Sequence, residues 1–177
     1  LVKDGNIKYK ELLEKIRTDY KKAYDVIQLK HTTPYQKSLD YYDALYAIYK
    51  DKDVPAYLER MKRYLASLGE DANGADYASA AQSLYYAAAS KLRPEDHRQA
   101  IAWLEKAIPG ETVLMNKINY LVMVGDSYKE LKDYASARKY YNQAYAESLQ
   151  LASMEQAQQV VQASVTYKLA TLELLEK

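Results

Sequence analysis

The amino-acid sequence predicts an all-α protein, and three observations support this fold class. Ala, Leu, Lys, Glu, Gln and Tyr dominate the composition, and most of these residues favour helices. Residues that break helices are scarce, with 5 Gly and 4 Pro among 177 residues. Apolar residues also recur three and four positions apart along most of the chain, which is the spacing of one helix face.

Eight helices can be placed from this spacing. Short polar segments separate them, so consecutive helices are expected to lie antiparallel. The predicted helices cover residues 7–30, 34–50, 54–68, 75–92, 94–108, 112–131, 134–151 and a last helix from Ser153 to the end.

Side-chain oxygens mark the predicted start of three helices. Thr33 and Gln36 have the spacing of a capping box before the second helix. Asp53 is the expected N-cap of the third helix, because its carboxylate can accept hydrogen bonds from unpaired N–H groups of the first turn. Ser153 and Gln156 have the capping-box spacing before the last helix.

Three turn sequences divide the chain. The stretch 69–74 is the longest polar, Gly-containing segment, and it separates degenerate helical hairpins in residues 1–70 from more regular repeats in residues 75–177. Pro109-Gly110 ends the fifth helix, and Lys132-Asp133 joins the sixth and seventh. We expect both parts to belong to one continuous array.

Two segments of the chain repeat the same pattern of small and large apolar residues 37 positions apart. Such a fixed period is typical of a stacked supersecondary unit and predicts an α-solenoid of antiparallel helical hairpins. The first segment contains Leu84, Ala88, Ala100, Leu104 and Ala107, and the second contains Leu121, Gly125, Ala137, Tyr141 and Ala144.

The second segment resembles the signature of the tetratricopeptide repeat family. In that signature a large residue, a Leu-Gly pair and a Tyr on one helix face an Ala and an aromatic residue on the next. The matching residues are Leu121-x2-Val124-Gly125-x2-Tyr128 and Ala137-x3-Tyr141. The resemblance implies a superhelix in which Gly125 lets the two helices of a hairpin approach closely.

Outside this segment the resemblance weakens. Lys91 stands where the family has Tyr, His97 stands where an aromatic residue is usual, and Leu149 replaces a frequent Pro. Leu169-Ala170 with Leu172 resembles the opening of a third, incomplete repeat. The clear resemblance covers residues 78–151.

The resemblance also implies a binding face, because the first helix of each hairpin lines the concave side of such arrays. Chaperone-binding members place a Lys and Asn clamp there, whereas this chain has Tyr85 or Val122 at the Lys position and Ala89 or Asp126 at the Asn position. The lining combines aromatic, aliphatic and amide side chains, which favours an extended or helical peptide as the ligand. The implied peptide-binding residues are Gln82, Tyr85, Tyr86, Ala89 and Leu92 in the first repeat, and Asn119, Val122, Met123, Asp126 and Lys129 in the second.

Charge and hydropathy argue against other kinds of partner. The 25 basic and 24 acidic residues alternate along the helices and leave a net charge of +1, so no nucleic-acid ligand is expected. No apolar run reaches the ~18–20 residues that cross a bilayer, so no membrane insertion is expected within this fragment.

No residue pattern points to catalysis, a cofactor or a metal. The chain has no Cys, which excludes thiolate chemistry. His31 and His97 lack the spacing of paired ligands and are expected to be structural. Some acidic residues cluster without the alternation of a calcium loop and are expected to serve caps and loops: Asp51, Asp53, Glu70, Asp71 and Asp76.

These observations predict a non-catalytic protein- or peptide-binding scaffold. One hypothesis makes it the recognition region of a larger bacterial sensor or regulator, and the lack of Cys slightly favours a periplasmic over a cytoplasmic location. A second hypothesis is a self-contained intracellular adaptor. A third, a helical enzyme or small-molecule receptor, requires a deep pocket with buried titratable groups. The sequence leaves the oligomeric state and the partner open.

Overall fold

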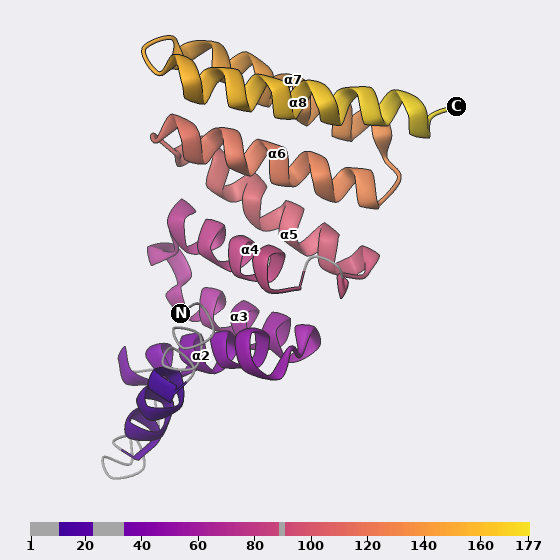
Figure 1. Cartoon of the computed structure of the whole chain (residues 1–177). Coiled ribbons are helices and arrows are strands. Elements are labelled where there is room, and N and C mark those ends of the chain that lie inside the picture. Colours follow the sequence, from indigo (N-terminus) through magenta and orange to yellow (C-terminus); the bar gives the residue numbers. More distant parts are fainter. Residues whose placement is uncertain (1–10, 23–33, 89–90) are drawn as a thin grey trace. The chain divides into compact units, whose positions relative to one another are not determined.

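A computed structural model of the chain describes residues 11–22, 34–88 and 91–177. Within these residues it contains eight helices that pack in antiparallel pairs, which confirms the all-α prediction (Figure 1). Ala89, His31, the cap Thr33 and both predicted ends of the first helix lie outside the described residues. No helix among the described residues is both long and apolar enough to cross a membrane.

The helix boundaries agree with the predicted ones to within a few residues. The first helix is seen over residues 11–22, and the others are α2 (Pro34–Tyr46), α3 (Val54–Leu68), α4 (Gly74–Ala88), α5 (Pro94–Ala107), α6 (Leu114–Glu130), α7 (Tyr134–Ser148) and α8 (Glu155–Leu175). Short 3-10 or π-helical turns extend four of them: Ala47–Asp51, Gly69–Asp71, Ile108–Gly110 and Leu149–Leu151.

The chain divides into two compact units. The first consists of Leu1–Ala72 and Gln82–Lys91, and the second of Asn73–Ala81 and Leu92–Lys177, so helix α4 contributes residues to both. In the first unit α2 packs against α3. In the second unit α5, α6, α7 and α8 pack in sequence, each against the next.

In the first unit, a tight turn directly precedes α3. Lys52 adopts a left-handed conformation with φ 57°, which lets the chain reverse after the π-helical turn. The Asp53 carboxylate then accepts a hydrogen bond of 2.9 Å from the backbone N–H of Ala56. Asp53 is therefore the N-cap of α3, as predicted.

The core of the second unit is built from the repeat positions. Leu121, Ala137, Tyr141 and Ala144 belong to one buried cluster, to which α8 adds Val165, Leu172 and other apolar residues. Gly125 faces the ring of Tyr141 so closely that a Cβ atom at Gly125 would lie 2.4 Å from Cε1. The expected close approach of the two helices at Gly125 is thus present.

The predicted start of α8 is wrong in detail. Ser153 and Gln156 do not form a capping box, because α8 begins at Glu155 and its N-cap residue, Met154, has no side-chain cap hydrogen bond. The Gln158 side chain instead donates hydrogen bonds to the carbonyl oxygens of Ser148 (3.0 Å) and Leu149 (3.3 Å). These bonds link the first turn of α8 to the end of α7.

Candidate functional site

Four of the predicted binding residues form a row along α6. Asn119, Val122, Asp126 and Lys129 follow one another at spacings of three and four residues, which places them on one helix face. Asn119 is exposed, and the other three are partly exposed. Met123, which was predicted to line the same face, is only 5% exposed and belongs to the core.

Asp126 is held by contacts from two other helices. Its Oδ1 atom accepts a hydrogen bond of 2.6 Å from the Tyr141 hydroxyl on α7. The same oxygen lies 2.6 Å from the ammonium nitrogen of Lys168 on α8, in an ion pair that is mostly shielded from water. The Lys168 nitrogen also lies 5.8 Å from the centre of the Tyr141 ring. Asp126 therefore joins three helices at the centre of the row.

The sequence did not reveal Lys168 as part of this site. Its partner Asp126 is 42 positions away, and no motif links the two residues. The role of the Tyr141 hydroxyl was only weakly predictable from the sequence. A buried Tyr needs a hydrogen-bond acceptor, whereas a Phe at the same position would need none.

The predicted binding residues on α4 belong to the first unit. Gln82 and Tyr85 are partly exposed, and Tyr86 is 69% exposed. The rings of Tyr85 and Tyr86 meet edge to face, with centroids 6.3 Å apart. This pair gives α4 an accessible aromatic surface.

His97 is buried in the first turn of α5, as expected of a structural residue. It is 6% exposed, and its Nδ1 atom has no hydrogen-bond partner among the described residues. Burial lowers its pKa from 6.5, although the charges of Glu130 and Asp96 act in the opposite direction. The neighbouring Asp96 is fully buried and accepts a hydrogen bond of 2.9 Å from the backbone N–H of Arg93.

We expect acid to destabilise the fold through His97. Because the folded-state pKa lies below the ordinary value, the unfolded chain binds more protons as the pH falls below about 6.5, and folding stability is lost there. The melting temperature should drop between about pH 8 and about pH 5.5, and it should drop less in His97→Phe. Equal drops in both proteins would show that His97 does not contribute.

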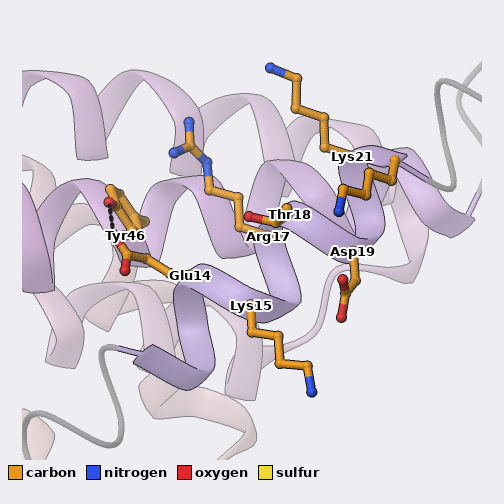
Figure 2. Close-up of a pocket in the computed structure, with 8 residues that line it drawn as sticks. Glu14, Lys15, Arg17, Thr18, Asp19, Lys21 and Tyr46 are labelled. Carbon is orange, nitrogen blue, oxygen red and sulfur yellow. Dashed lines mark hydrogen bonds between the residues drawn. The ribbon is translucent and has the colours of Figure 1, made fainter.

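A shallow hollow in the first unit gives no support to the enzyme hypothesis. It has a volume of about 560 Å³ and lies along the helix of residues 11–22. Figure 2 shows the Tyr46 hydroxyl pointing at Glu14, to which it donates a hydrogen bond of 2.9 Å. Arg17 lies over the Tyr46 ring and donates a hydrogen bond of 2.6 Å to Asp43. Every residue that lines the hollow is exposed or partly exposed, so no titratable group is buried in it.

A second hollow, of about 410 Å³, lies in the second unit between α5 and the end of α6. Glu105 lines it and accepts a hydrogen bond of 2.6 Å from Tyr140, whose pKa is raised chiefly by burial. The Tyr140 ring stacks on Tyr128 with centroids 5.6 Å apart. Neither hollow is lined by His97 or Asp96, and no group of three potential metal ligands occurs among the described residues.

Comparison with protein families, with curated proteins and with solved structures finds no match for this chain. The likeness to tetratricopeptide repeats therefore stays a prediction that depends on the residues of α6 and α7.

Proposed function

We propose that the chain is a non-catalytic protein- or peptide-binding scaffold with tetratricopeptide-like packing, and that the row on α6 contacts the ligand. The observation that carries this proposal is the row itself. It presents an exposed amide at Asn119, an apolar surface at Val122 and an ammonium group at Lys129 along one side of one helix. An extended peptide offers backbone amides, apolar side chains and carboxylates, which match these groups in turn.

The anchoring of Asp126 supports this assignment. A binding surface loses less free energy on association when its side chains are already ordered. The hydrogen bond from Tyr141 and the ion pair with Lys168 fix the middle of the row without using Asn119 or Val122. Among the described residues Lys129 forms an ion pair only with the adjacent Glu130, at 3.2 Å, and a pair this accessible to water is weak enough to exchange for a ligand carboxylate.

The proposal is tested with peptides selected from a random library displayed on phage, with the folded chain as bait. Selected peptides are titrated against the chain and against Asn119→Ala, and we expect the variant to bind about two- to tenfold more weakly because one hydrogen bond is lost. Asn142→Ala is the matched control, since Asn142 is an exposed Asn on α7 and does not belong to the row. Equal affinities for all three proteins, or no enrichment of any peptide, would contradict the proposal.

A further inference from the structure

Lys168 lies on the face of α8 that packs into the core of the second unit. Val165 precedes it by three positions and Leu172 follows it by four, so all three residues share one side of the helix. Both neighbours are fully buried. Lysine is among the residues least often found at such a position, and it is seldom buried there unless its charge is paired. The partner of Lys168 is Asp126, whose carboxylate lies 2.6 Å from the ammonium nitrogen.

Packing alone does not require a charge at position 168. The Lys168 side chain is 27% exposed and the Asp126 side chain 16%, so both groups have given up most of their hydration to form the pair. Replacing an ion pair shielded in this way by apolar residues of similar size is often neutral for stability. The charge of Lys168 is therefore better explained by its effect on Asp126, which belongs to the α6 row.

The ion pair changes the charge that the α6 row presents to a ligand. The row contains two charged residues, Asp126 and Lys129. The charge of Asp126 is compensated within the chain by Lys168. Lys129 pairs with Glu130 at 3.2 Å, but successive residues of a helix are rotated by about 100°, so Glu130 lies outside the row and its pair with Lys129 is open to water. The charge that the row offers to a ligand is thus that of an ammonium group.

We infer that Lys168 sets the charge preference of the α6 row: by neutralising Asp126, it makes the row select peptides with acidic side chains over peptides with basic ones. A carboxylate of the peptide pairs with Lys129, whereas an ammonium group of the peptide finds Asp126 already paired. Without Lys168, the uncompensated Asp126 carboxylate would attract basic side chains and repel acidic ones. This inference rests on the proposed function, because it names the class of peptide that the row accepts.

Fluorescence anisotropy with pairs of labelled peptides tests this preference. Each peptide obtained from the phage selection is synthesised with Glu or with Lys at one position at a time, and both forms are titrated against the unmodified chain and against Lys168→Met. We expect the unmodified chain to bind the Glu form more tightly at the positions that contact the row. In Lys168→Met the ratio of the two affinities should shift towards the Lys form by about tenfold at the same positions, and added salt should reduce this shift.

Further variants separate the effect of charge from damage to the fold. The double variant Asp126→Asn/Lys168→Met leaves no uncompensated carboxylate and should restore the preference for the Glu form. Lys139→Met is the matched control, because Lys139 also lies over a Tyr ring, 5.7 Å from the centre of Tyr140, but does not belong to the row. It should bind both forms as the unmodified chain does. Thermal melting shows which variants fold, and Lys168→Gln, which keeps a hydrogen-bond donor without the charge, takes the place of Lys168→Met if the latter does not.

The possible outcomes distinguish this inference from the proposed function. If peptides bind and Asn119→Ala weakens them, but the ratio of Glu to Lys affinities is the same with and without Lys168, the inference is wrong and the scaffold function stands. A preference of the unmodified chain for the Lys form, or a shift that the double variant does not reverse, would also overturn the inference. If no peptide is enriched in the selection, the proposed function fails and the inference fails with it.

Discussion

Replacing Gly125 by Leu is expected to destabilise the second unit by about 1–3 kcal/mol through overpacking. Even the first added atom, a Cβ, would lie 2.4 Å from Cε1 and 2.6 Å from Cδ1 of Tyr141. The Tyr141 ring is fully buried and cannot move aside without disturbing the cluster around it. Leu favours a helix over Gly by at most about 1 kcal/mol, so the steric clash with Tyr141 should determine the net change in stability.

Urea denaturation followed by the fluorescence of Trp103 measures this change. Trp103 is the single Trp of the chain and is buried in α5 of the same unit. Gly110→Ala is the control, because a Cβ atom at Gly110 would meet no heavy atom within 4 Å. If Gly125→Leu unfolded at the same urea concentration as the unmodified chain, the packing of α6 on α7 would be assigned wrongly.

Replacing Tyr141 by Ala should cost more, about 3–5 kcal/mol, because it leaves a cavity where the largest side chain of the cluster stood. The ring touches residues of both α6 and α8, so neither neighbour alone can move in to fill the space. The same denaturation experiment reports the loss, and circular dichroism shows whether the variant still folds.

A matched variant separates the ring from its hydroxyl. Tyr141→Phe keeps the ring and removes the hydroxyl that donates a hydrogen bond to Asp126. Since Lys168 still pairs with Asp126, the carboxylate keeps a partner, and the cost should be about 1 kcal/mol. If Tyr141→Phe were as unstable as Tyr141→Ala, the hydrogen bond and not the ring would hold the three helices together.

The sequence predicts the helices well because each depends on local signals. Apolar spacing identified all eight, and Asp53 was found from the chemistry of a helix start. The close contact at Gly125 was also predictable, because a small residue on one helix and an aromatic residue at a fixed spacing on the next are typical of two helices packed closely together.

The candidate site was less predictable because it depends on tertiary contacts. Met123 was assigned to an open face from repeat geometry, but it is buried in the unit. Lys168 could not be found from the sequence, since an ion pair between residues 42 positions apart leaves no local pattern. The capping box at Ser153 was wrong because α8 begins two residues later, at Glu155.

The contact of Asp126 with both Tyr141 and Lys168 has a consequence for how the chain opens. In an array of helical hairpins each element usually contacts only its neighbours, and a terminal helix can fray independently. Here a detached α8 would leave the Asp126 carboxylate without its cation, beside a buried tyrosine. Fraying of the last helix and loosening of the α6–α7 hairpin should therefore occur together, and their amide protons should exchange with solvent as one cooperative group.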